Sequence, residues 1–207
     1  MSLETLLQRD DLWRGGGLAG AAPSGLATGH AGLDALLPGG GWAHGALTEL
    51  LIAREGLGEL GLVLPALARL TRQGAWTACI GPPHLPYAPA LAAAGLELAR
   101  LLVVRPEDPE DRLWALEQTL RSGACGAVLG WGGARMADRA LRRLQLAAEA
   151  GGCAAFLFRP ETAAEHASPA PFRLRVSAGE DGPQVELLKC RGAPAGRTVP
   201  LGGHAVA

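Results

Sequence analysis

One stretch of this 207-residue chain combines the residue types and the spacing of a phosphate-binding site. Residues 46–52 predict a buried strand, residues 53–58 a glycine-containing loop, and the residues from about Glu59 a long apolar helix. The free N–H groups and the dipole at such a helix start attract phosphate. A functional P-loop reads G-x-x-x-x-G-K-[ST], in which the lysine contacts the β- and γ-phosphates and the hydroxyl binds Mg²⁺. Here Gly58 is followed by Glu59 and Leu60, so the sequence predicts a nucleotide-binding scaffold that has lost its nucleotide chemistry.

The same loop, from Gly56 to Gly61, also fits the G-x-G-x-x-G pattern of dinucleotide-binding folds. Those folds place an acidic residue about 20 positions further on, where it holds the ribose hydroxyls. No Asp or Glu occurs between Glu59 and Glu97. We therefore interpret Gly56 and Gly58 as residues of a tight turn and predict no nucleotide-binding residue here. Glu59 would repel a phosphate, and we interpret it as a cap of the helix start, where the dipole favours a carboxylate by roughly 0.3–1 kcal/mol.

A local cluster of positive charge follows later in the chain and consists of Arg135, Arg139, Arg142 and Arg143. In the helix predicted for residues 136–150 the last three share one face, whereas Leu141, Leu144 and Ala148 face the core. A weak contact with single-stranded DNA or with an acidic partner is one interpretation. A solvated helix face is the other, and it is the preferred one.

No other arrangement of residues indicates catalysis or metal binding. The five histidines, His30, His44, His84, His166 and His204, show no H-E-x-x-H or Cys/His spacing, and no G-x-S-x-G motif occurs. The sequence therefore predicts no catalytic residue, no metal site and no cofactor. The four cysteines, Cys79, Cys125, Cys153 and Cys190, contain no C-x-x-C pair, so we expect reduced thiols, with Cys79 and Cys153 buried as small hydrophobic groups.

The composition is that of a neutral globular protein. The 19 basic and 20 acidic residues give a net charge of −1, which argues against a nucleic-acid-binding protein that acts alone. The first 13 residues contain acids and no long apolar region, and no run of about 18 apolar residues occurs anywhere. We expect one α/β domain in a cytoplasmic protein.

The ends of the chain differ from its middle. We expect an N-terminal helix in residues 1–14, a linker in residues 15–27, the domain in residues 28–200 and a flexible tail in residues 201–207. The helix carries an apolar stripe of Leu3, Leu6 and Leu7, which predicts a partner interface. Packing on its own domain, on a second copy of the chain or on another protein all remain open.

Short apolar strands alternate with helices through the domain. Strands are expected at residues 75–80, 101–104, 126–131 and 153–158, and helices at residues 31–37, 86–94, 109–122 and 136–150. This alternation indicates βαβ units and a mostly parallel β-sheet flanked by helices. Residues 172–177 and 184–190 alternate polar and apolar around a glycine-rich turn, which predicts a C-terminal antiparallel hairpin at the sheet edge. Residues from Gly192 onward are expected to be loosely ordered.

The order of these motifs resembles the RecA recombinase core. The matching residues are Thr28-Gly29, Leu33-Asp34, Leu37, Gly39-Gly40, Gly45 and Glu49. In this resemblance Glu59 and Leu60 stand where the P-loop has its lysine and threonine. Trp131 stands where the Walker B strand ends in an aspartate, and Lys189 and Arg191 match a Lys-x-Lys pair that reaches the neighbouring protomer. The resemblance implies a RecA-like α/β core with degenerate Walker motifs.

Within that superfamily the chain resembles the ImuA family of translesion DNA synthesis proteins, which are also described as SulA-like. The segments that carry the resemblance are TELL, PPHLPYAPAL, LWALEQ-LRSGACGAVL, RALRRLQLAAEAGG and LLK-RG-PAG. The resemblance implies a non-enzymatic role in SOS mutagenesis through contacts with the polymerase-like ImuB, with RecA or with both. By analogy with protomer docking in RecA filaments, the predicted interface residues are the N-terminal leucine stripe, Lys189 and Arg191. Partners of this kind imply a cytoplasmic protein that is associated with the nucleoid through them. A SulA-like cell-division inhibitor that binds the septation GTPase is the alternative, and an active RecA-like ATPase is disfavoured.

Overall fold

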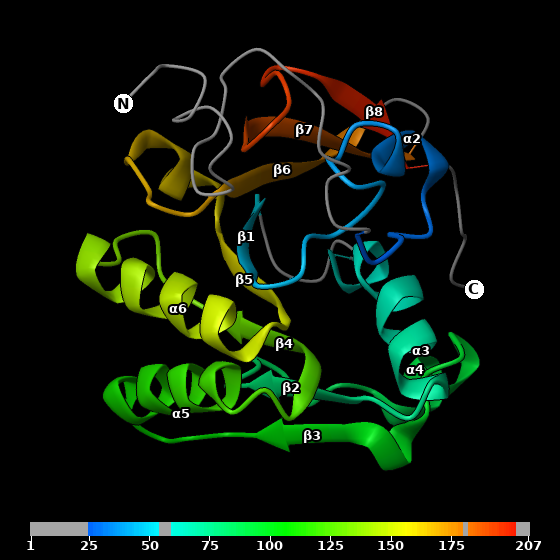
Figure 1. Ribbon diagram of the computed structural model, residues 1–207, viewed down its shortest axis with the longest axis vertical. Helices are drawn as coiled ribbons and strands as arrows, with labels where there is room; N and C mark the ends of the chain where they lie inside the picture. The colour runs from blue at the N-terminus through cyan, green and yellow to red at the C-terminus, as the bar shows by residue number, and fades with distance from the viewer. Residues whose placement is uncertain (1–24, 54–58, 180–181, 202–207) are drawn as a thin grey trace, which may run out of the picture.

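The computed structural model describes residues 25–53, 59–179 and 182–201 (Figure 1). Its strands form one eight-stranded sheet in the order β3-β2-β4-β5-β1-β6-β7-β8. The strands are β1 (Ala46–Ile52), β2 (Trp76–Ile80), β3 (Leu101–Val104), β4 (Cys125–Trp131), β5 (Ala154–Pro160), β6 (Phe172–Gly179), β7 (Gly182–Cys190) and β8 (Thr198–Pro200). The α-helices are α2 (Ala31–Asp34), α3 (Leu64–Arg72), α4 (Ala88–Ala93), α5 (Pro109–Arg121) and α6 (Asp138–Gly151). Short 3₁₀ helices are η1 (Glu59–Leu62), η2 (Leu98–Arg100) and η3 (Glu161–Glu165).

The six strands from β3 to β6 in this order run parallel, and β7 and β8 continue the sheet in antiparallel pairing. The predicted mostly parallel sheet with a C-terminal antiparallel hairpin is therefore confirmed. All seven residues of the central strand β1 are buried, because it has neighbours on both edges and helices over both faces.

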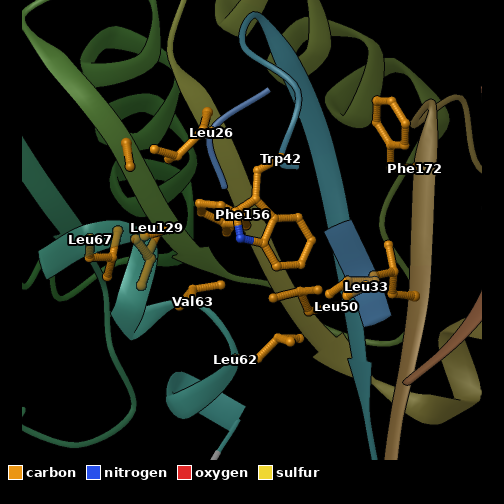
Figure 2. Packing of buried hydrophobic residues seen from close by; sticks show 14 of the residues in the cluster. Leu26, Leu33, Trp42, Leu50, Leu62, Val63, Leu67, Leu129, Phe156 and Phe172 are labelled. Carbon is orange, nitrogen blue, oxygen red and sulfur yellow. The ribbon is translucent and has the colours of Figure 1, made fainter. Parts of the chain in front are cut away.

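Two apolar layers cover the faces of the sheet, with α5 and α6 on one side and α3 and α4 on the other (Figure 1). In the second layer the indole of Trp42 packs edge-on against Phe156, with ring centroids 5.2 Å apart. Figure 2 shows this pair surrounded by aliphatic side chains, among them Leu50 of β1 and Leu62 of η1. The helix α6 contributes Leu141, Leu144 and Ala148 to the first layer, as its periodicity predicts.

The residues that carry the RecA resemblance near the start of the domain have structural roles. The backbone N–H of Thr28 donates to Oδ1 of Asp34 at 2.7 Å, and the Thr28 hydroxyl accepts from the N–H of His30 at 3.0 Å. Gly29 has φ +87°, and a Cβ there would lie 2.4 Å from the Cβ of Pro65 in α3. This segment therefore docks on α3 by backbone contact that only glycine permits.

Three predictions differ from the observed elements. The helix predicted for residues 31–37 ends at Asp34, and the backbone oxygen of Leu33 accepts from the N–H groups of both Leu36 and Leu37 in the turn that follows. The helix expected from Glu59 is divided into η1 and α3, and Pro65 occupies the first turn of α3, where its missing N–H and fixed φ are tolerated. The expectation that residues from Gly192 are loosely ordered is wrong for Thr198–Pro200, which pairs with β7 as β8. The reason is burial, since Val199 packs against the core and Leu201 is 6% exposed.

The predicted N-terminal helix, most of the predicted linker and the tail from residue 202 lie outside the described residues. No helix in the described ranges combines the length and apolarity that crossing a membrane requires.

Candidate functional site

The carboxyl ends of the parallel strands form the edge at which open α/β sheets bind ligands. At the end of β1, Gly56 and Gly58 lie outside the described residues. Glu59 begins η1, is 8% exposed and lines a cavity of about 180 Å³ together with Ile52 and Val176. Leu60 packs its side chain against the apolar core. Among the described residues that line this cavity none carries a positive charge, so nothing described here would offset the charge of a triphosphate.

The end of β4 is occupied by aromatic side chains. Trp131 stacks on Phe158 of the neighbouring strand β5, with ring centroids 5.2 Å apart and 19° between the ring planes. The position that the resemblance assigns to a metal-binding aspartate is thus part of an apolar stack. Neither ring can hold a metal-bound water by a carboxylate. Groups of three or more His, Cys, Asp or Glu side chains placed to bind a metal do not occur in the described ranges.

Glu49 of β1 is the most enclosed carboxylate near this edge, with 0% of its surface exposed. Its Oε1 accepts from Arg159 Nη1 at 2.6 Å and from the Ser168 hydroxyl at 2.8 Å, and its Oε2 accepts from Arg173 Nε at 2.6 Å. Two guanidinium groups and a hydroxyl therefore occupy both carboxylate oxygens. Glu49 is a structural centre and is not available as a general base.

The two arginines extend this network to loops. Arg159 donates to the backbone oxygens of Gly133 and Ala134 at 3.2 and 2.9 Å, and Arg173 donates to Ala163 O at 2.7 Å. The network thereby joins β1, β5 and β6 to the loop between β4 and α6 and to η3. We call Glu49, Arg159 and Arg173 the buried charge centre. Sequence reasoning noted Glu49 as a motif match but did not predict its partners.

A pocket of about 580 Å³ lies at the carboxyl ends of β2, β3 and β4. It is lined by Gly81, Pro82 and Pro83 after β2, by Arg105, Pro106 and Glu107 after β3, by Trp131, Gly132 and Gly133 at the end of β4, and by Arg112 of α5. We call it the β2–β4 pocket. Sequence reasoning missed it, because its lining comes from three separate loops. The available signal was an arginine directly after a predicted strand.

Arg112 has an unusual environment in this pocket. Its Nε is buried and has no hydrogen-bond partner among the described residues. An unmade hydrogen bond of a buried donor costs about 1–3 kcal/mol. Gly81 has φ +63°, and a Cβ there would lie 2.4 Å from Cδ of Arg112. The absence of a side chain at Gly81 therefore lets the arginine lie across the turn.

The predicted basic cluster is only partly free. Arg143 forms an ion pair with Glu117 of α5, whose other oxygen accepts from Arg121 at 2.9 Å. Glu117 is 4% exposed, so the pair ties α6 to α5 at a buried carboxylate. Arg135, Arg139 and Arg142 are exposed and make no ion pair with any described residue.

The residues predicted as an interface lie partly within the described ranges. Leu3, Leu6 and Leu7 lie outside them. Lys189 of β7 is exposed and donates to Ser168 O at 2.8 Å, which places it next to the buried charge centre, and Arg191 is exposed at the end of β7. Their role as an interface stays a prediction.

The four cysteines are free thiols, and Cys79, Cys125 and Cys153 are buried, as expected for Cys79 and Cys153. Burial raises the pKa of Cys79 from 9.0 to about 12 and that of Cys153 to about 11. Burial also raises the pKa of Cys125 and of Cys190. These thiols are protonated near neutral pH and are poor nucleophiles.

Comparison with known proteins extends the sequence resemblance. The model of the family described as cell division inhibitor SulA matches residues 45–155, which is more than half of the chain. The chain is 36% identical over 103 residues to "Cell division inhibitor SulA" of Edwardsiella piscicida, covering 49% of this chain and 61% of that protein. It is 33% identical over 116 residues to "Protein RecA" of Chlorobium chlorochromatii (strain CaD3), covering 56% of this chain and 32% of that protein. The matched part thus spans less than two thirds of the length of these relatives.

The fold also matches a solved structure. The crystal structure of the RadB recombinase superposes with a TM-score of 0.66 at 17% sequence identity, covering 84% of this chain and 94% of that chain. This likeness shows the fold, which is RecA-like.

Proposed function

We propose that this chain, which belongs to the SulA family, acts in the response to DNA damage by binding other proteins and does not hydrolyse nucleotide. The observation that carries the proposal is the chemistry at the end of β1. A buried Glu59 stands where a P-loop needs a lysine, and the described lining of that cavity holds no cation. Phosphoryl transfer depends on positive charge placed around the transferred group.

The end of β4 supports the same proposal. A RecA-like ATPase also needs a carboxylate that positions the metal ion and its water. Trp131 fills that position here and is held by its stack on Phe158. The two substitutions remove separate parts of the machinery, so restoring either one alone would not restore hydrolysis. The remaining RecA-like fold serves as a rigid body with exposed surfaces for partners.

The specific role that we propose is that of an ImuA-type protein in translesion DNA synthesis, with ImuB, RecA or both as partners. The motif order that resembles RecA and the 33% identity to a RecA protein support a place beside the recombinase. Lys189 and Arg191, both exposed at the end of β7, are the described residues proposed to contact the partner.

A SulA-like cell-division inhibitor is the second candidate. It is favoured by the family match and by the names of the similar SulA proteins. In this case the partner would be the septation GTPase. Both candidates are binding functions, so the loss of nucleotide chemistry does not distinguish them.

The experiment that separates the candidates is capture of purified partners by the full chain. We expect ImuB or RecA to co-elute with the chain and the septation GTPase to elute alone. Expression in a bacterial host should then affect damage-induced mutagenesis without producing filamentous cells. Co-elution with the septation GTPase together with filamentation would replace the first candidate by the second.

Nucleotide chemistry is tested separately with the same preparation. We expect no release of phosphate from Mg-ATP above the buffer background and no difference between the wild type and Glu59→Ala. Hydrolysis that disappears in Glu59→Ala would contradict the non-enzymatic proposal.

A further inference from the structure

The β2–β4 pocket contains positive charge that the rest of the described chain does not neutralise. Arg105 and Arg112 both line it, and neither makes an ion pair or a side-chain hydrogen bond within the described ranges. This distinguishes them from Arg143, Arg159, Arg173 and Arg175, each of which is paired with a carboxylate.

The geometry of Arg112 indicates the kind of group that it would bind. Its Nε is buried, whereas its terminal nitrogens Nη1 and Nη2 are not among the buried atoms and make no hydrogen bond within the described ranges. These terminal N–H groups are therefore the donors that a ligand oxygen in the pocket can reach. A guanidinium binds planar oxyanions with two parallel N–H donors, and carboxylates match that spacing. Gly81 allows the side chain to lie over the turn after β2, because a Cβ there would lie 2.4 Å from Cδ of Arg112.

The charge of the lining favours one negative charge over several. Arg105 and Arg112 contribute two positive charges, and Glu107 contributes one negative charge, so the lining carries a net positive charge of about one. The single negative charge of a carboxylate matches this net charge. A triphosphate carries several negative charges, which exceed the positive charge of the lining and would be repelled by Glu107. The indole of Trp131, fixed by its stack on Phe158, adds an apolar wall for the methylene groups of an acidic side chain.

We propose that the β2–β4 pocket receives the carboxylate of an Asp or Glu side chain that a partner protein presents. This inference rests on the proposed protein-binding function and assigns a place and a chemistry to the contact. Arg112 binds the carboxylate and Arg105 contributes to it from the rim.

The test uses the full, ¹⁵N-labelled chain and follows the arginine Nε–H and tryptophan indole signals by NMR. The probe is N-acetyl-glutamate methylamide, added to about 50 mM because a single contact of this kind has a dissociation constant on the order of millimolar. The glutamine analogue has the same shape without the charge, and inorganic phosphate is the competing anion. The variants are Arg112→Gln, Arg105→Gln and, as a control that removes the same charge from the exposed face of α3, Arg69→Gln.

We expect the glutamate probe to shift the Arg112 and Trp131 signals to saturation, with an affinity about tenfold or more above that of the glutamine probe, since one charge-assisted hydrogen-bonded pair is lost. Arg69→Gln should bind like the wild type, Arg105→Gln more weakly, and Arg112→Gln should show no saturable shift. The ¹⁵N spectrum will show whether Arg112→Gln folds. If it does not, the affinities of Arg105→Gln and Arg69→Gln for the glutamate probe are compared, and weaker binding by Arg105→Gln alone supports the proposal.

Equal shifts by both amino-acid probes, tighter binding of phosphate, or wild-type affinity in Arg105→Gln and Arg112→Gln would each overturn the proposal. The partner-capture experiment keeps the two proposals apart. A partner that binds wild type and Arg112→Gln equally would overturn the pocket assignment and leave the binding function intact. Saturable probe binding with no partner captured would support the pocket and count against the proposed function.

Discussion

Arg159 Nη1 lies 2.6 Å from Oε1 of Glu49, and the Nε of the same guanidinium donates to Gly133 O at 3.2 Å. Gly133 belongs to the wall of the β2–β4 pocket. The buried carboxylate of Glu49 in β1 therefore holds, through Arg159, the loop after β4 that forms one wall of this surface pocket. The contacts of Arg159 thus stabilise the sheet and position the wall of the β2–β4 pocket at the same time.

Removal of the charge on Glu49 should destabilise the protein strongly. In Glu49→Gln the two buried guanidinium groups of Arg159 and Arg173 lose their counter-ion, and we expect the free energy of unfolding to fall by about 3–5 kcal/mol. Urea denaturation followed by circular dichroism measures this change.

The matched control is Glu186→Gln, which removes a carboxylate that pairs with Arg175 at 2.9 Å on a partly exposed surface. Partly exposed ion pairs contribute about 0–1 kcal/mol, so this variant should unfold almost like the wild type. Similar decreases in the free energy of unfolding of both variants would show that the buried ion pairs of Glu49 stabilise the protein no more than a partly exposed pair does.

The second prediction concerns the contact between α5 and α6. A Cβ at Gly151 would lie 1.9 Å from the backbone oxygen of Leu120, and neither backbone can yield without moving its helix. We expect Gly151→Ala to lower the free energy of unfolding by on the order of 3 kcal/mol. Thermal unfolding of the variant measures the loss.

Gly152→Ala is the control for backbone conformation, since Gly152 has φ +66° with nothing within 4 Å of its Cβ position. An L residue in this left-handed conformation costs roughly 1–2 kcal/mol. The steric prediction requires Gly151→Ala to be the less stable of the two, and the reverse order would refute it.

Local patterns were sufficient to predict the strands β1 to β7. The bounds of β1 and β3 agree with the prediction at every residue, because a short, mostly apolar run defines a strand in a parallel sheet. The run in β1 begins after Gly45, and the run in β3 lies between Arg100 and Arg105. The ends of α4 and α6 differ by one or two residues, which is the usual uncertainty of helix termini. The strand β8 was not predicted, because its three residues are stabilised by pairing with β7 and carry little periodicity of their own.

Contacts across the sheet could not be predicted in the same way. Glu49 and Arg159 are separated by 110 residues, and one sequence does not indicate which buried charges meet. The pairing of Glu117 with Arg143 was missed for the same reason. The match of Glu59 and Leu60 to the P-loop lysine and threonine, by contrast, rests on neighbouring residues in the sequence, and the loss of nucleotide chemistry stays a prediction.

The third prediction is a dependence of stability on alkaline pH. Burial raises the pKa of Cys79 from 9.0 to about 12, so between these values the unfolded chain releases a proton that the folded chain retains. The contribution of this thiol to the free energy of unfolding is therefore fully present below pH 9 and is lost as the pH rises toward 12. For this one thiol the free energy of unfolding should fall by up to about 1.4 kcal/mol per pH unit.

The comparison of wild type with Cys79→Ala isolates that thiol from the other groups that titrate at high pH. We expect the stability of the wild type relative to the variant to decrease between pH 9 and 10.5 in urea denaturation. A constant difference over this range would mean that Cys79 ionises in the folded protein as readily as in the unfolded chain.

The last prediction distinguishes a solvated helix face from a DNA-binding one. Arg139 and Arg142 are exposed on α6 without an ion pair to a described residue, whereas Arg143 is held by Glu117. A face with two free arginines on a chain of net charge −1 should release few counter-ions when it binds DNA. The affinity for single-stranded DNA should therefore be weak at 150 mM salt and depend little on the salt concentration.

The double variant Arg139→Gln/Arg142→Gln should unfold within about 0.5 kcal/mol of the wild type and capture the same protein partner. Fluorescence anisotropy with a labelled oligonucleotide over a salt series provides the measurement. Tight binding by the wild type, with a steep salt dependence that the double variant loses, would make α6 a DNA-binding element and would require DNA in the proposed assembly.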